Sequence, residues 1–209
     1  MKKVYLTKDD YDYTHRMGRL RQQYPNNFSY DKDSRVGDIG EKIIIQLLID
    51  YGWTIISSFR TNLPTGELKK FDIVASKYGK VRKFEVKLDL KAYPGKNKRV
   101  LKLKDYDCEV SADKDTGNGF IEISDEDANG TQQDSGVIAT TSDYFITIYV
   151  FIGEIWVNSP TRIINLAKEY NWPVFPGGFL KKTRGWLFKR KHFETFFKIK
   201  KFELKISEY

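Results

Sequence analysis

Two acidic residues and a lysine fall on neighbouring segments in which polar and apolar side chains alternate. Asp72 belongs to the first segment, and Glu85 and Lys87 belong to the second, with the turn-forming pair Tyr78-Gly79 between them. Carboxylate oxygens are suitable ligands for Mg²⁺ or Mn²⁺, and water completes the octahedral shell of such ions. A bound cation of this kind lowers the pKa of water and neutralises a phosphate group. These residue types therefore indicate metal-assisted chemistry on phosphate esters.

A hairpin across these segments would gather the three groups on one face of a sheet. In the register whose opposed residue numbers sum to 157, Asp72 faces Glu85. The same register pairs Phe71 with Val86 and Ile73 with Phe84, which gives two apolar pairs on the other face. Lys87 shares the face of Glu85, because side chains alternate along a strand. Facing carboxylates repel each other unless a cation lies between them, which favours a metal site. The alternative is a charged sheet face that is exposed to solvent.

Sequence patterns around the hairpin predict the elements that must hold it. A helix is predicted to begin near Ser34 or Asp38 and to end before Gly52. Its predicted buried face consists of Ile44, Leu47, Leu48 and Tyr51. We predict strands at 53–59, 71–75, 81–88, 99–103, 120–123, 144–151 and 154–157. The segment 144–151 is apolar on both faces, which predicts a central strand. A further helix is predicted to begin at Pro160, with Ser159 as its N-cap.

Composition narrows the class of protein. The chain has 209 residues and one cysteine, Cys108, which excludes disulfide frameworks and multi-cysteine metal sites. Two histidines, His15 and His192, are too few for a histidine-rich zinc site. The longest apolar run, 144–152, is far shorter than the ~20 residues that a membrane-spanning helix needs. We therefore expect no membrane partner and a cytoplasmic location, which for a viral protein is the cytoplasm of the host.

Charge is distributed very unevenly along the chain. Residues 69–104 carry 13 Lys and Arg against 3 Asp and Glu, whereas residues 105–134 carry 1 against 10. Residues 181–209 are basic again, with 10 against 3. Basic segments that also contain aromatic rings are typical of nucleic-acid contacts, although a solvated, self-neutralising surface is the alternative. The predicted nucleic-acid-binding residues of the tail are Lys181, Lys182, Arg184, Lys189, Arg190 and Lys191.

Asp72, Glu85-Val86-Lys87 and the preceding Gly40-Glu41 together resemble the PD-(D/E)xK nuclease superfamily, and most of all its phage, viral and Holliday-junction-resolvase-like members. The family core is a helix, three strands, a helix and a fourth strand. The resemblance implies an α/β fold with a restriction-endonuclease-like core, whose mixed central sheet is flanked by helices. It implies that Asp72, Glu85 and the carbonyl of Val86 bind Mg²⁺ or Mn²⁺. It also implies that Lys87 is catalytic and that Glu41 supports the site.

The sequence departs from the family pattern in two places. Phe71 precedes Asp72 where the family often has proline, and no clear second core helix is predicted between Leu88 and Tyr144. Glu122, on a predicted strand, is open to two interpretations: a further metal ligand, or a pairing or surface residue. The predicted organisation is an N-terminal arm or lead-in helix, a nuclease core with an insertion, and a basic aromatic segment packed on the core. These parts are 1–34, 35–170 with the insertion 91–135, and 171–209.

The most direct functional hypothesis is a metal-dependent endonuclease that acts on the phosphate backbone of DNA. Two other hypotheses remain open. One is a nucleic-acid-binding protein that keeps the nuclease fold without catalysis, and the other is a protein-interaction module. Many members of the superfamily are dimers, so the resemblance also allows a homodimer.

Overall fold

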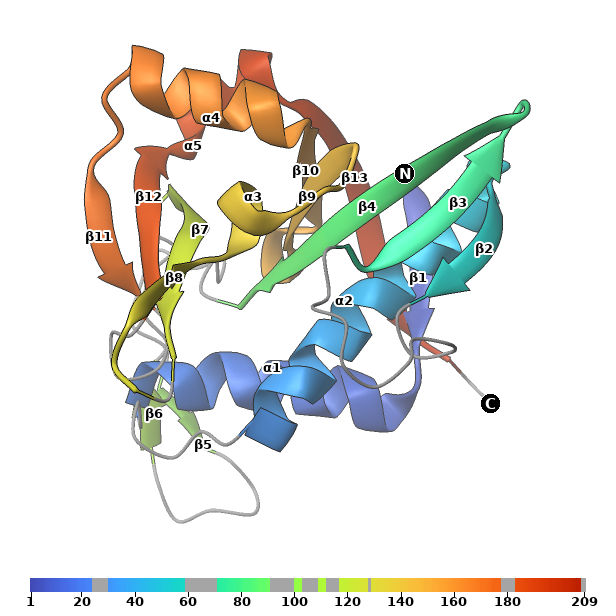
Figure 1. Cartoon of the computed structure of the whole chain (residues 1–209). Helices are drawn as coiled ribbons and strands as arrows, with labels where there is room; N and C mark the ends of the chain where they lie inside the picture. The colour runs from blue at the N-terminus through green and yellow to red at the C-terminus, as the bar shows by residue number, and fades with distance from the viewer. Residues whose placement is uncertain are drawn as a thin grey trace.

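The computed structural model describes residues 1–23, 30–58, 71–90, 100–102, 109–111, 117–127, 129–177 and 183–207. Within these residues the main feature is a seven-stranded sheet in the order β1-β13-β10-β9-β4-β3-β2 (Figure 1). Its strands are β1 (Lys2–Leu6), β2 (Thr54–Ser58), β3 (Ile73–Lys77), β4 (Lys80–Asp89), β9 (Tyr144–Tyr149), β10 (Glu154–Asn158) and β13 (Lys198–Ile206). The sheet is mixed, because β1 runs parallel to β13 and β4 parallel to β9, while the other pairs are antiparallel. The predicted mixed α/β fold is therefore confirmed.

A smaller sheet and a set of helices complete the described fold. The smaller sheet has the order β11-β12-β7-β8, with β11 (Val174–Gly177), β12 (Thr183–Lys189), β7 (Asn118–Glu126) and β8 (Gln132–Asp134). A separate pair consists of β5 (Val100–Lys102) and β6 (Glu109–Ser111). The helices are α1 (Lys8–Gln23), α2 (Tyr30–Asp50), α3 (Gly136–Ala139), α4 (Pro160–Glu169) and α5 (Arg190–Phe193), with 3-10 turns η1 (Val150–Ile152) and η3 (Glu194–Phe196).

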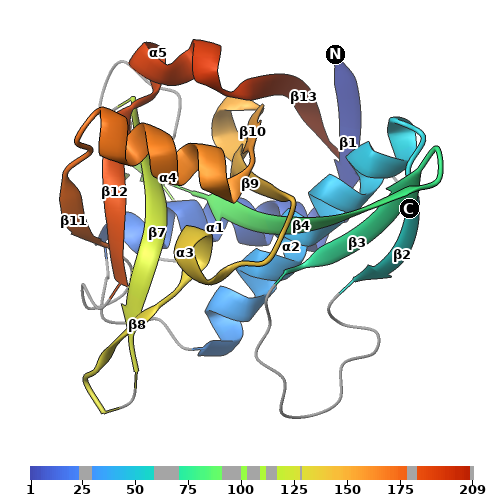
Figure 2. The same ribbon diagram turned by 45° about the horizontal axis from the view of Figure 1, so that its top comes forward.

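Each face of the main sheet contributes to its own hydrophobic core. Phe84, Val86 and Ile148 share a core with α1 and α2 on one face, and Phe145 and Tyr149 share a core with α4 and the smaller sheet on the other. Figures 1 and 2 show the two groups of elements on opposite sides of β4 and β9. Because side chains alternate along β4, the odd-numbered residues Glu85 and Lys87 lie on the face of the second core.

The close approach of α2 to β4 depends on a glycine. A Cβ atom built on Gly40 would lie 3.3 Å from the Cβ of Leu88 and 3.5 Å from Cγ1 of Val86. The helix therefore rests almost directly on the strand at this point, and a larger residue would need its neighbours on β4 to shift by a few tenths of an ångström. This contact fixes the position of the next helical residue, Glu41, relative to β4.

The predicted hairpin register is confirmed over the paired part of β3 and β4. Ile73 pairs with Phe84 and Lys77 with Lys80, so opposed numbers sum to 157. The turn residues Tyr78 and Gly79 both have positive φ angles, 51° and 75°. Two such residues form the type of tight turn that matches the twist of antiparallel strands. The ladder ends at Ile73, the residue that follows Asp72 in the chain, so it does not include Asp72.

Other predicted elements are confirmed with adjusted boundaries. The helix predicted from Ser34 or Asp38 begins earlier, at Tyr30, and Tyr51 follows its end with 36% exposure instead of lining its buried face. The central strand predicted at 144–151 is confirmed as β9, which ends at Tyr149, and the last two residues belong to η1. In α4, Ser159 accepts a hydrogen bond from the N–H of Arg162 and Pro160 opens the helix, as predicted. Two segments differ from prediction: 125–135, expected to be loop, contains β8, and the irregular stretch after Trp172 contains β11.

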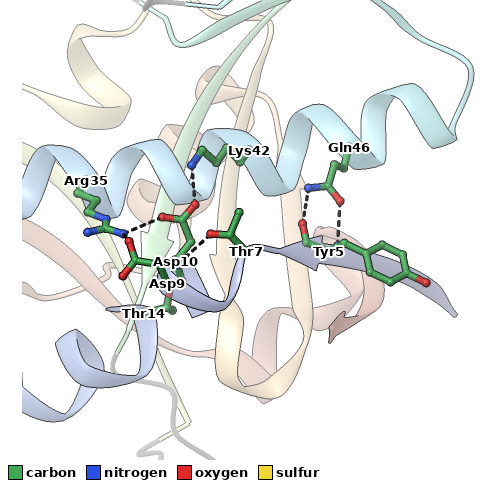
Figure 3. Close-up of polar contacts among 8 residues, drawn as sticks. All are labelled: Tyr5, Thr7, Asp9, Asp10, Thr14, Arg35, Lys42 and Gln46. Carbon is green, nitrogen blue, oxygen red and sulfur yellow. Dashed lines mark hydrogen bonds and ion pairs between the residues drawn. The ribbon is translucent and has the colours of Figure 1, made fainter. Parts of the chain in front are cut away.

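The N-terminal segment is an integral part of the sheet, which corrects the expectation of a polar arm. Residues of β1 pair in parallel with β13, and Val4 and Leu6 are buried. The side-chain amide of Gln46 on α2 hydrogen-bonds to the main chain of Tyr5 in both directions, at 2.9 Å to its N–H and 2.7 Å to its carbonyl (Figure 3). The helical part of the prediction holds, because α1 follows β1 directly.

A buried carboxylate ties α1 to α2. Asp10, which is 6% exposed, accepts hydrogen bonds from Lys42 at 2.5 Å and from Arg35 at 3.1 Å (Figure 3). Burial raises the pKa of Asp10, but the two cations lower it by more, so that the net pKa lies below that of an ordinary aspartate. The first turn of α1 is thus held by a charged link to the helix that packs on β4. No helix in the described part of the chain is both long and apolar enough to cross a membrane.

Candidate active site

Next to the end of the β3–β4 ladder, the side-chain carboxylate of Asp72 takes the place of a main-chain carbonyl as hydrogen-bond acceptor for β4. Asp72 is 4% exposed, and its Oδ2 accepts the N–H of Val86 at 2.6 Å. Its own N–H donates to the carbonyl of Phe84 at 2.8 Å. The ladder has ended at Ile73, so Asp72 does not sit in the paired position opposite Glu85 that the sequence suggested. The carboxylate instead accepts the N–H of Val86, the residue directly after Glu85. Asp72 and Glu85 therefore lie beside the same part of β4.

Glu85 and Lys87 form an ion pair on this part of β4. The Nζ of Lys87 lies 3.3 Å from Oε1 of Glu85. The Glu85 side chain is 11% exposed, whereas that of Lys87 is 41% exposed. Glu85 is therefore held in the interior of the site, while part of the longer Lys87 side chain reaches the surface.

Three carboxylates act on the charge of Lys87. Partial burial lowers the pKa of the Lys87 ammonium, and the negative charges of Glu122, Glu85 and Asp72 raise it by more. The net pKa lies above that of an ordinary lysine, so the side chain is a cation at neutral pH. The structure thus brings Asp72, Glu85 and Lys87 together, as the sequence predicts, and adds Glu122 from the smaller sheet.

A short segment between β8 and β9 connects Glu122 with Glu85. At its start, the hydroxyl of Ser135 donates to Oε1 of Glu122 at 2.6 Å. At its end, the hydroxyl of Thr140 makes a weak hydrogen bond of 3.5 Å to Oε2 of Glu85. Between them lies α3, which begins at Gly136 with a φ of 52°. A Cβ atom on Gly136 would lie 2.4 Å from the carbonyl oxygen of Glu122, so only glycine allows this contact. The segment holds an acid on each of the two sheets.

Glu41 lies on α2 and is 6% exposed. Its helix packs on the face of β4 that carries Val86, and Glu85 and Lys87 project from the other face. The sheet geometry alone therefore does not bring Glu41 to Lys87. Its supporting role stays a prediction.

The oxygen ligands of the site suit a hard divalent cation. Asp72 and Glu85 supply two largely buried carboxylates, and the carbonyl of Val86 could supply a third oxygen. Proteins usually bind Mg²⁺ through one or two carboxylates and leave several waters in place, so this donor set fits the ion. Within the residues that the structure describes, no group of three or more His, Cys, Asp or Glu side chains is placed to hold a metal ion. Glu122 acts electrostatically on Lys87, and a role as a further metal ligand stays a prediction.

The basic residues predicted to bind nucleic acid do not form one uniform surface. Arg184, Lys189 and Lys191 are exposed. Arg190 is 6% exposed and stacks over the ring of Tyr149 at 4.4 Å, so its expected role at the surface is wrong. Lys181 and Lys182 lie outside the described residues. The sequence does not distinguish the buried Arg190 from the exposed basic residues, because basic and aromatic residues alternate in this tail. Either kind of side chain can be buried in an amphipathic segment.

No protein-family model, curated protein or solved structure matches this chain.

Proposed function

We propose that the protein is a metal-dependent nuclease that hydrolyses phosphodiester bonds in DNA as an endonuclease. The observation that carries this proposal is the convergence of Asp72, Glu85 and Lys87 on one short stretch of β4. Buried carboxylates beside an ammonium suit a reaction in which a dianionic transition state develops on phosphate. The proposed place of action is the cytoplasm, which for a viral protein is that of the host.

The order of the elements supports a restriction-endonuclease-like core. Helix α2 is followed by β2, β3 and β4 as an antiparallel series, and β9 then lies parallel to β4. A helix, three strands and a fourth strand in this order are what the resemblance to the PD-(D/E)xK superfamily implies. In this proposal α3, of only four residues, stands in the place of the second core helix, and β7 and β8 of the smaller sheet lie in the same connection between β4 and β9.

Each residue of the site has a distinct proposed role. Asp72 and Glu85, with the carbonyl of Val86, would hold Mg²⁺ or Mn²⁺. A bound ion of this kind supplies Lewis-acid activation of water and of the phosphate. Lys87 donates from its ammonium to a phosphate oxygen as a charged hydrogen-bond donor. Exposed basic residues such as Lys191 contact the backbone without reading base sequence.

A cleavage assay tests the proposal. Supercoiled plasmid, linear duplex, single-stranded and branched DNA are incubated with Mg²⁺, with Mn²⁺ and with EDTA. The expected result is cleavage that EDTA abolishes and that Asp72→Asn, Glu85→Gln and Lys87→Gln each reduce by at least about 100-fold. Lys168→Gln and Glu169→Gln on the exposed side of α4 are matched controls and keep full activity. DNA binding without cleavage under every condition would support the non-catalytic alternative, and neither binding nor cleavage would support an interaction module.

A further inference from the structure

The turn of the β3–β4 hairpin carries an aromatic residue in an unfavourable backbone conformation. Tyr78 has a φ of 51°, in the left-handed region that asparagine and glycine adopt more easily. The two-residue turn that it forms with Gly79 is most often Asn-Gly or Asp-Gly. Asparagine at this position would therefore strain the backbone less than tyrosine does.

The tyrosine ring adds nothing to the hydrophobic core. Tyr78 is 90% exposed, which is more than any other large hydrophobic residue in the described part of the chain. Figures 1 and 2 show that the hairpin projects beyond the elements around it, with the turn at its far end. The ammonium of Lys77 lies 5.0 Å from the ring centroid, so the ring has a cation beside it. An exposed ring on a strained turn is suited to contact another molecule.

The surroundings of the ring are basic. Between Ile73 and Phe84 the hairpin contains Lys77, Lys80, Arg82 and Lys83 and no acidic residue. Lys80 and Lys83 are both exposed. A partner must therefore be negatively charged and must also offer a flat surface to the ring. Nucleic acid meets both requirements, whereas an acidic protein surface meets only the first.

We infer that the tip of the β3–β4 hairpin (Lys77 to Lys80) binds nucleic acid at an unpaired base, with Tyr78 stacking on that base. In a duplex both faces of each base are covered by neighbouring bases, so stacking requires a single strand, a junction or an end. Six residues separate Tyr78 from Asp72, which at about 3.3 Å per residue places the tip about 20 Å from the carboxylates. This inference rests on the proposed function for the choice of DNA, and it narrows the substrate to DNA with unpaired bases.

Binding measured without cleavage tests the inference separately from the proposed activity. Fluorescence anisotropy is recorded in EDTA with labelled oligothymidylate of about 20 nucleotides, long enough to span the tip and the carboxylates, and with a blunt duplex of the same length. We expect Tyr78→Asn and Tyr78→Ala to raise the Kd for oligothymidylate about tenfold, and Tyr78→Phe to keep the affinity. Lys80→Gln with Lys83→Gln should lower the slope of log K against log salt by about 1.4, or about 0.7 for each phosphate contact.

Matched controls and unfolding measurements complete the test. Tyr5→Asn on β1 and Lys198→Gln with Lys201→Gln on β13 make the same chemical changes on other strands and should leave the Kd unchanged. Tyr78→Asn should unfold at the same temperature as the native chain or at a higher one, which excludes misfolding as the cause of lost binding. Unchanged Kd in both Tyr78→Asn and Tyr78→Ala would overturn the inference, as would equal competition by polyglutamate. Lost binding in these variants of a protein that never cleaves DNA would uphold the inference and refute only the nuclease proposal.

Discussion

The carboxylate of Asp72 accepts the main-chain N–H of Val86 at 2.6 Å, so one side chain both ends the β3–β4 ladder and forms a wall of the candidate active site. Asp72 therefore has a structural role and a proposed chemical role that substitutions can separate. The hydrogen bond needs an oxygen acceptor, whereas metal binding needs the negative charge.

Asp72→Asn and Asp72→Ala are expected to differ in stability and to agree in activity. The alanine leaves the buried N–H of Val86 without this acceptor and should cost about 1–3 kcal/mol of unfolding free energy. The asparagine can present its amide oxygen to the same N–H, so its cost should be smaller. Both should lack metal-dependent cleavage. Urea unfolding and a plasmid cleavage assay measure the two effects, and equal stability of the two variants would refute the structural role.

Gly136→Ala should destabilise the protein more than Gly130→Ala, although both glycines have positive φ angles of 52° and 81°. A Cβ on Gly136 would meet the carbonyl oxygen of Glu122 at 2.4 Å, whereas the nearest atom to one on Gly130 is 4.0 Å away. Conformational strain of about 1 kcal/mol applies to both variants, and steric overlap adds a further ~1–3 kcal/mol to the first. Thermal unfolding of the two variants measures both losses of stability. Equal losses would contradict the predicted steric overlap at Gly136.

Glu122→Gln should reduce kcat and leave KM nearly unchanged. The substitution keeps an acceptor for the Ser135 hydroxyl but removes one of the negative charges that act on Lys87. We expect a loss of about tenfold, equivalent to ~1.4 kcal/mol in the transition state. Asp134→Asn, on the exposed strand β8, removes a charge close by and serves as the control. A rate for Glu122→Gln equal to that of the control would show that Glu122 has no part in the reaction.

Asp10 should make the stability of the protein fall at acid pH. Its pKa is lower in the folded state than the ~3.9 of an unfolded aspartate. The stabilisation is therefore fully present above about pH 4 and is lost as the pH falls through the folded pKa. Asp10→Asn should flatten this acid dependence and cost about 1–3 kcal/mol at neutral pH. Urea unfolding between acid and neutral pH gives both values, with the exposed Asp12→Asn as a control that keeps the native pH profile.

The hairpin could be predicted because its information is local. Polar and apolar residues alternate along β3 and β4, and the turn between them prefers residues in the left-handed conformation. Together these features predict the pairing register of the hairpin. The apolar pair Ile73 and Phe84 distinguishes this register from one shifted by a residue. The central position of β9 was equally visible, because a strand buried on both faces has no polar alternation. The alternation places Glu85 and Lys87 on one face of β4, whereas Asp72 joins them through its hydrogen bond to the N–H of Val86 beyond the end of the ladder.

The features that sequence did not reveal depend on contacts between distant segments. Strand β1 is short and polar at alternate positions, and its partner β13 lies at the other end of the described chain. Glu122 reaches the site because the smaller sheet folds over β4. The hydrophobic periodicity of a single sequence predicts individual strands and helices, but not which of them come into contact. Arg190 resembles its exposed neighbour Lys191 in sequence, yet it is buried against Tyr149. Burial of a cation is decided by tertiary packing, so composition could not separate the two.

The parallel pairing of β1 with β13 has a consequence for biosynthesis. During translation β1 emerges early, and it cannot join its neighbour until almost the whole of the described chain has left the ribosome. In the folded chain the amide of Gln46 occupies both main-chain groups of Tyr5, on the edge of β1 that does not face β13. Because β1 is the last strand on that side of the sheet, the glutamine covers one residue of an edge that would otherwise be open to pairing with another chain.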